Sequence, residues 1–136
     1  MYISKVKINN YRSFINTEID LNEGINVLIG HNNAGKSNLL KALAIVLGST
    51  SKKMSIHDFN KDIKLEKLKG GPPRITIEIH ITQSTNEDLM GDDLVTVSNW
   101  LTKLEEPYEA KLQYEFFLPV TEHDNYLKKI YKRWKF

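Results

Sequence analysis

The sequence has no cysteine, little net charge and no long hydrophobic run. Without cysteine it has neither a disulfide scaffold nor a zinc site built on thiolates. A formal net charge of only +2 does not by itself indicate a nucleic-acid partner. The longest apolar stretch, Leu39 to Leu47, is interrupted by Lys41 and is too short to cross a bilayer. No secretory signal pattern is found either, so we expect a cytoplasmic protein without a membrane partner.

The composition is that of a globular protein, with 40% hydrophobic and 26% charged residues among 136. This length suits one domain rather than two. Within one domain over 1–136 we expect four parts. They are a β-hairpin with the P-loop strand and helix over 1–48, a loop over 49–73, a β-subdomain with a helix over 74–120, and a C-terminal helix over 121–136.

Hydrophobic periodicity predicts the elements of that domain. Alternating apolar and polar residues predict strands over 2–8, 17–21, 75–81 and 112–118. The nearly continuous apolar run Ile25 to Ile29 predicts a strand covered on both faces. Helical spacing predicts helices over 38–47, over 92–105 and from Glu122 onward, with Gly48 as the cap of the first. We therefore expect an α/β fold, with an antiparallel β-subdomain beside the start of a mixed sheet.

One segment carries a recognisable chemistry. Gly30-His31-Asn32-Asn33-Ala34-Gly35-Lys36-Ser37 matches the P-loop pattern G-x-x-x-x-G-K-[ST] in full, between a predicted strand and a predicted helix. The glycines let successive backbone N–H groups point inward at phosphate oxygens, and the helix N-terminus adds a positive dipole end. Lys36 is expected to reach the β- and γ-phosphates, and the Ser37 hydroxyl to hold Mg²⁺. The sequence thus predicts ATP and Mg²⁺ as cofactors.

Other P-loop classes fit less well. A GTPase needs an Asn-Lys-x-Asp guanine reader, but Asn60-Lys61-Asp62 has its Asp one place early and no Asp-x-x-Gly switch is present. A small-molecule kinase would need an arginine-bearing lid, and the chain has only three arginines. A Gly-rich turn that contains Lys-Ser by chance remains the structural alternative.

The first 48 residues resemble the opening of SMC/RecF-like ABC-type ATPases. The matching features are Ile8-Asn9-Asn10-Tyr11-Arg12-Ser13-Phe14, then Gly24-Ile25-Asn26-Val27-Leu28-Ile29-Gly30, then Asn32 and Gly35-Lys36-Ser37-Asn38. Within that branch the chain is most similar to the OLD-family ATP-dependent endonucleases, which the Asp58-Phe59 step and the isoleucine-alternating strand also suit. The resemblance implies an incomplete N-terminal lobe of a P-loop ATPase.

The resemblance also implies a site. Asn32, Lys36, Ser37 and Asn38 would lie at the triphosphate, and Arg12 would approach the nucleotide from its turn. The alternative for Arg12 is an exposed turn cation. A glutamine sensor of Mg²⁺ and γ-phosphate is expected after the β-subdomain strand, where Gln83 and Gln113 are candidates; solvated strand positions are the simpler interpretation of both.

Several parts of such an ATPase are missing from the sequence. No apolar run ends in Asp-Glu, no Ser-Gly-Gly signature occurs, and no carboxylate cluster resembles a metal-dependent nuclease; Asp92-Asp93 is a poor substitute. No catalytic residue is assigned. The leading hypothesis is one lobe of a DNA-repair or phage-defence ATPase that dimerises around two nucleotides, completed by a further lobe or partner subunit. A stand-alone nucleotide-binding regulatory module and an inactive truncated product are the alternatives.

Two further features favour ordinary structure over function. The tail from Lys128 to Lys135 mixes basic and aromatic residues, but acidic residues begin and cations end this predicted helix, as a helix dipole favours. A solvated face is therefore preferred to a DNA contact. His57, His80 and His123 have no metal-ligand spacing.

Overall fold

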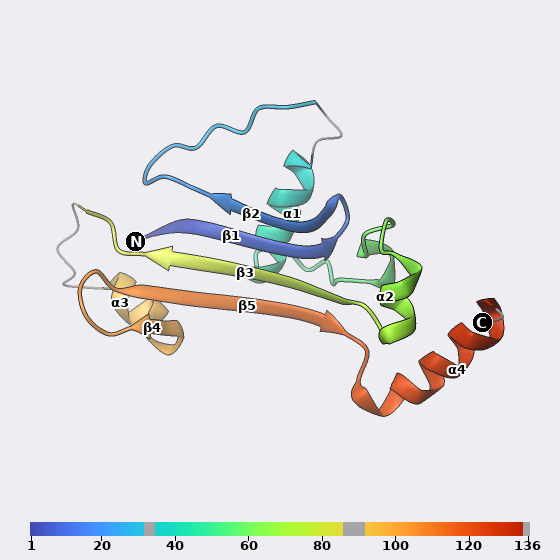
Figure 1. Ribbon diagram of the computed structural model, residues 1–136. Helices are drawn as coiled ribbons and strands as arrows, with labels where there is room; N and C mark the ends of the chain where they lie inside the picture. The colour runs from blue at the N-terminus through green and yellow to red at the C-terminus, as the bar shows by residue number, and fades with distance from the viewer. Residues whose placement is uncertain (32–34, 86–91, 135–136) are drawn as a thin grey trace.

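Five strands form one sheet in the order β2-β1-β3-β5-β4, and every pairing is antiparallel (Figure 1). The computed structural model describes residues 1–31, 35–85 and 92–134. The strands are β1 (Tyr2–Tyr11), β2 (Phe14–Asp20), β3 (Arg74–Thr82), β4 (Leu101–Lys103) and β5 (Glu109–Phe117). The α-helices are α1 (Lys36–Val46), α2 (Leu65–Gly70), α3 (Asp92–Val97) and α4 (His123–Trp134), and the short 3-10 helices are η1 (Ile56–Asp58), η2 (Ser98–Trp100) and η3 (Val120–Glu122).

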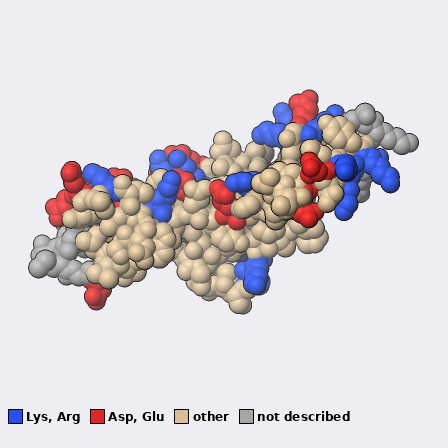
Figure 2. Space-filling view, turned by 90° about the horizontal axis from the view of Figure 1, so that it is seen from below, with Lys and Arg blue, Asp and Glu red and all other residues tan. Residues whose placement is uncertain are grey.

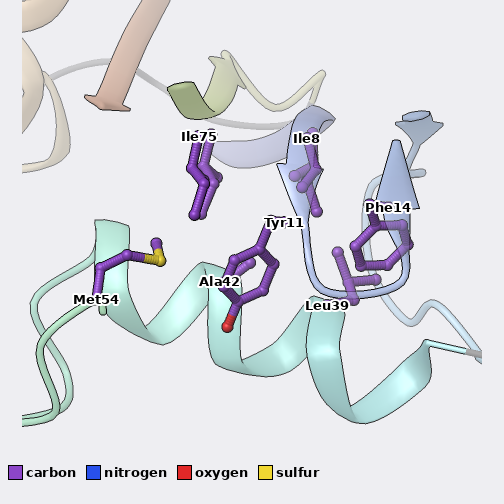
Figure 3. Packing of buried hydrophobic residues seen from close by; sticks show 9 residues of the cluster. Ile8, Tyr11, Phe14, Leu39, Ala42, Met54 and Ile75 are labelled. Atoms are coloured by element: carbon purple, nitrogen blue, oxygen red, sulfur yellow. The ribbon is translucent and has the colours of Figure 1, made fainter. Parts of the chain in front are cut away.

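The register puts one apolar face of the sheet under α1. Val6 lies opposite Ile79 and Ile8 opposite Ile77, and all four side chains are fully buried. Leu39 and Ala42 of α1 pack onto this face, as Figure 3 shows from close by. Burying each such aliphatic side chain contributes roughly 1.5–3 kcal/mol. The alternation predicted for β1 and β3 is thereby confirmed, and it fixes where α1 must lie.

The C-terminus of α1 is closed as predicted by Gly48. Its φ of 69° is left-handed, and its N–H donates to the carbonyl of Ile45 at 3.3 Å. The N–H of Ser49 donates to the carbonyl of Ala44 at 3.0 Å. These two bonds form a Schellman motif, which satisfies carbonyls that the helix leaves unpaired.

The strand expected over Ile25 to Ile29 is absent, which corrects the sequence prediction. Ile25, Val27 and Ile29 are 92%, 74% and 90% exposed, and the segment follows an extended path away from the sheet (Figure 1). Asn26 instead makes local hydrogen bonds with Asn22. A strand needs a neighbour to bond with, and no described residue supplies one here. The mixed sheet expected from this strand is therefore absent as well.

The helix expected over 92–105 is confirmed only over its first residues and is wrong beyond Val97. α3 ends at Val97, and the chain then forms η2 and the edge strand β4, in which Leu101 pairs with Ala110 of β5. The run Val95-Thr96-Val97 is β-branched and therefore a weak helix former. The leucine spacing mimicked a helix, whereas pairing with the free edge of β5 prevailed.

The region expected as loop over 49–73 holds η1 and α2, which the sequence analysis did not predict. The C-terminal helix is confirmed as α4, and Tyr126 on it donates to the carbonyl of Leu68 in α2 at 3.0 Å. The two chain ends lie at opposite ends of the molecule (Figure 1). In the part of the chain that the structure describes, no helix has the length and apolar character to span a bilayer.

Candidate nucleotide-binding site

The predicted phosphate loop joins the exposed segment Ile25–Ile29 to the first residue of α1. Asn32, Asn33 and Ala34 lie outside the described residues. Gly35 precedes α1 with φ 98°, a left-handed conformation that disfavours side chains. A Cβ at this position would lie 2.9 Å from Ser13 Oγ and 3.1 Å from Phe14 Cζ. Backbone conformation and close packing against the β1–β2 turn therefore both require glycine here.

The N-terminus of α1 is open to an anion. The first N–H groups of any α-helix lack partners within the helix, and here neither a capping side chain nor an acidic residue of the first turn competes for them. The Lys36 side chain donates to the carbonyl of Gly30, where the loop begins, with 2.5 Å between Nζ and O. A positive charge thus lies between the two ends of the loop, while Ser37 is exposed beside it.

Arg12 lies beside this helix end but is held by an acidic partner. It occupies a left-handed turn with φ 48°, and Nε and Nη2 lie 3.0 and 2.9 Å from Oδ1 of Asp58. Nη1 donates to Oδ1 of Asn38 at 3.4 Å, and Nδ2 of Asn38 donates to Oγ of Ser13 at 3.0 Å. The structure therefore brings together Arg12 and Asn38, two of the predicted site residues.

The sequence analysis did not identify what positions Arg12. Asp58 is 8% exposed, and its other oxygen, Oδ2, accepts from the N–H of Ser55 at 2.9 Å as part of a capping box on η1. Nδ2 of Asn60 donates to the carbonyl of Arg12 at 2.6 Å. The spacing Ser55-x-x-Asp58 is the signal that could have located the capping box, although not its long-range partner.

A hollow of about 680 Å³ opens between this network and η1. Arg12, Ser13 and Asn38 line one side, and the chain from His57 to Asp62 lines the other. Its volume lies within the roughly 300–1,000 Å³ of small-molecule pockets. The hollow adjoins the α1 N-terminus through Asn38, so a molecule whose phosphates lie at the loop has adjacent space for its remaining parts.

The glutamine candidates lie elsewhere. Gln83 follows the end of β3, where Thr82 pairs with Tyr2, and its side-chain oxygen accepts from the N–H of Tyr108 at 3.0 Å. Gln113 is exposed and donates to Glu115 at 2.7 Å. Neither approaches the turn at Arg12, so both fit the simpler interpretation as strand-end and surface residues.

The side chains that the structure describes do not form a metal cage. Among the described residues no three His, Asp or Glu side chains cluster as metal ligands. Mg²⁺ is commonly held by one or two protein groups together with substrate phosphates and water. The exposed Ser37 hydroxyl fits that pattern, in which the nucleotide supplies most of the ligands.

Lys and Arg side chains gather at the end of the molecule that carries α4 (Figure 2). Lys128, Lys129 and Lys132 are exposed there, while Tyr126 and Leu127 on the same helix are half-buried. This division into a solvated basic face and an inward apolar face agrees with the structural interpretation of the tail.

A P-loop pattern leading into α1, next to an antiparallel sheet, is compatible with a P-loop nucleoside-triphosphatase fold. The chain belongs to the family described as "AAA ATPase domain", which matches residues 1–135.

Curated relatives match about a third of this chain. It is 53% identical over 45 residues to the DNA double-strand break repair Rad50 ATPase of Methanopyrus kandleri, covering 33% of this chain and 5% of that protein. It is 46% identical over 43 residues to the DNA replication and repair protein RecF of Clostridium botulinum Eklund 17B, covering 32% and 12%. It is 39% identical over 51 residues to the chromosome partition protein Smc of Methanococcus voltae, covering 38% and 4%. Each match spans only a small part of the relative's length.

Proposed function

We propose that this chain binds ATP, together with Mg²⁺, at the loop from Gly30 to Ser37. The observation that carries the proposal is the open N-terminus of α1 with the Lys36 ammonium bonded to Gly30 at the start of the loop. Backbone N–H groups in this arrangement bind phosphate oxygens, and a lysine at this place adds charge to the β- and γ-phosphates. Ser37 would contribute its hydroxyl to Mg²⁺.

The remaining site residues extend the same cradle. The backbone of Asn32, Asn33 and Ala34 would surround the phosphates. Asn38, two residues after Lys36, would also lie at the triphosphate. Arg12 would contribute positive charge from the turn, because Asp58 fixes its position without fully enclosing it: the Arg12 side chain is 36% exposed. The adjoining hollow would take the nucleoside.

The chain forms one lobe of a larger ATPase site in this proposal. The apolar residues Ile25, Val27 and Ile29 are exposed where strands of another lobe or subunit would cover them. The sequence also lacks the Asp-Glu and Ser-Gly-Gly segments that position water and contact the γ-phosphate. Because phosphoryl transfer depends on positioning and charge stabilisation, we expect ATP binding without appreciable hydrolysis by this chain alone.

The names of the relatives support a DNA-processing role for the assembled protein. Two of them are DNA-repair ATPases or proteins and the third partitions chromosomes. We infer a DNA-repair-type ATPase that dimerises around two nucleotides and acts on DNA. A finer assignment to the OLD-family endonucleases of repair or phage defence rests on the Asp58-Phe59 step and the strand after it, and stays a prediction.

Isothermal titration of the purified chain with Mg-ATP tests the proposal. Lys36→Ala removes charge-assisted contacts of roughly 1.5–3 kcal/mol and should weaken binding by about 10- to 150-fold. Lys128→Ala removes an equal charge from the exposed face of α4 and should leave ATP affinity unchanged. A demonstrably folded wild type that binds no ATP, or equal losses in both variants, would overturn the proposal.

The same material separates the alternatives. A stable monomer that binds ATP and gains no hydrolysis when a polypeptide carrying the Asp-Glu and Ser-Gly-Gly segments is added favours a stand-alone regulatory module. Hydrolysis that appears only when a polypeptide carrying the Asp-Glu and Ser-Gly-Gly segments is added favours the lobe of a larger ATPase. A folded chain that neither binds ATP nor responds to such a polypeptide is the outcome expected of an inactive product.

A further inference from the structure

A second hollow lies beside α1, more than one helical turn beyond the phosphate loop. It has a volume of about 250 Å³ and is lined from three directions: by Tyr11 and Arg12 at the end of β1, by Lys41 on α1, and by Thr50, Lys52 and Lys53 on the segment that leads to η1. This volume is below the usual range for drug-sized ligands, so the hollow suits a small ion or a terminal group.

Tyr11 has a polar atom with no partner at this hollow. Its side chain is fully buried, and its hydroxyl makes no hydrogen bond of normal geometry to a described residue, although the Arg12 guanidinium lies near enough to lower its pKa. Figure 3 shows the hydroxyl at the end of the ring away from the sheet, beside α1. Burial raises the pKa of Tyr11 above its usual value, so the hydroxyl stays protonated and can donate. A buried hydroxyl without a partner is rare in folded proteins and calls for a ligand or a water.

The charge of the hollow is strongly one-sided. Four cationic side chains line it against the single carboxylate of Asp58, which is already paired with Arg12. This leaves the three lysines, and none of them forms an ion pair with another described residue. A cleft lined by charges of one sign concentrates counter-ions.

A second hydroxyl adds to the donors. Oγ1 of Thr50 accepts from the N–H of Lys52 at 3.2 Å, which leaves the hydroxyl hydrogen available to donate. Two hydroxyl donors and three ammonium groups thus border one small cavity. Its one carboxylate, that of Asp58, already accepts from Arg12.

We propose that this hollow is a second anion site that binds a phosphate group, separate from the phosphate loop. A phosphate carries a charge of about −1.5 to −2 near neutral pH and several acceptor oxygens, which matches the donors and the lysine charges better than a single carboxylate does. Tyr11 donates from the floor of the site and Lys41, Lys52 and Lys53 surround its mouth. The phosphate belongs either to a free phosphate or monoester, or to the backbone of a nucleic acid.

The test uses the full chain with Lys36→Ala, so that phosphate binding at the loop is weakened. Inorganic phosphate is titrated at constant ionic strength while amide resonances are followed by ¹H–¹⁵N correlation spectra. We expect saturable shifts at Thr50, Lys52 and Lys53. Lys52→Gln/Lys53→Gln should weaken the affinity by about tenfold or more, and Tyr11→Phe by roughly threefold to tenfold.

Lys128→Gln/Lys129→Gln is the matched control, because it also removes two neighbouring exposed lysines. It should leave the titration unchanged. Three results would overturn the second site: shifts confined to the phosphate loop, shifts that do not saturate, or equal effects of both lysine pairs. Each would indicate that no phosphate contacts the Tyr11 hydroxyl. A failure of the wild-type chain to bind ATP would be a separate result, because the phosphate titration is carried out on a variant that lacks Lys36.

Anisotropy of a labelled oligonucleotide distinguishes the two sources of phosphate. If a nucleic-acid backbone occupies the site, Lys52→Gln/Lys53→Gln should lower the slope of log K against log salt by about 0.9 per lost duplex phosphate contact. If oligonucleotide binding is unchanged while phosphate binding is lost, a free phosphate or monoester is the occupant. Both results support the site, whereas unchanged behaviour toward both probes contradicts it.

Discussion

Asp58 holds Arg12 with one carboxylate oxygen and the start of η1 with the other. Oδ1 accepts from the guanidinium at 2.9–3.0 Å, and Oδ2 accepts from the N–H of Ser55 at 2.9 Å. Asp58→Asn keeps the shape but removes the charge, and it turns one of the two acceptors into a donor. One of the existing donors then faces an N–H group instead of an oxygen.

The cost of this change follows from the burial of the two partners. A hydrogen bond to a charged group contributes roughly 1.5–3 kcal/mol. The substitution affects the bonds from Arg12 and the bond from the N–H of Ser55. Because Arg12 is 36% exposed and can be rehydrated, we place the loss near the lower end, at about 2 kcal/mol. For 136 residues the unfolding entropy is about 0.29 kcal/mol/K, so Tm should fall by about 7 °C.

Thermal unfolding followed by circular dichroism measures this shift. Asp62→Asn is the control, since Asp62 is exposed and close in sequence. A double-mutant cycle with Arg12→Gln should give a coupling energy of about 1–2 kcal/mol. A Tm for Asp58→Asn equal to that of the control, or a coupling energy near zero, would show that the pair does not hold the turn in solution.

Three further changes test other parts of the fold. Gly35→Ala should destabilise the chain by roughly 2–3 kcal/mol in urea unfolding, because φ is 98° and the new Cβ would crowd Phe14. Gly48→Ala should cost only about 1 kcal/mol in the same assay, since φ is 69° but nothing lies within 4 Å. The hydrogen bond from Lys5 lowers the pKa of Glu18 below 4.5, so its stabilisation is present above that pH and lost as pH falls through the folded value. Glu18→Gln should therefore reduce the loss of stability between about pH 5 and about pH 3, measured by unfolding at several pH values.

Local patterns were sufficient for β1, β3 and the cap of α1, whose partners lie within the chain. The alternation in β1 and β3 was sufficient because each strand finds its neighbour in the same sheet. Gly48 was predicted for the same reason, since a helix cap depends on adjacent residues alone. The run Ile25 to Ile29 failed because its apolar character indicates burial without saying what covers it, and no described residue does.

The candidate site was predictable to a similar extent. The P-loop pattern located the helix N-terminus, and the family resemblance singled out Arg12. The partner Asp58 lies 46 residues away from Arg12, and no local pattern connects the two. The Tyr11 hydroxyl was equally hidden, because in sequence Tyr11 is only one residue of the motif from Ile8 to Phe14, and the surroundings of its hydroxyl are visible only in three dimensions.

The two ends of the predicted ATP loop are held very differently. On the α1 side Gly35 packs against Phe14, and Leu39 is buried in the core. On the other side the loop continues into the exposed segment Ile25–Ile29. A lobe that pairs with this segment would fix Gly30 relative to Lys36, and a nucleotide that bridges the loop would favour the same arrangement. Since coupling between two binding events is reciprocal, we expect Mg-ATP to tighten binding of the completing lobe by the same factor by which that lobe tightens ATP. Equal affinities for the lobe with and without nucleotide would show instead that the two ends of the loop act independently.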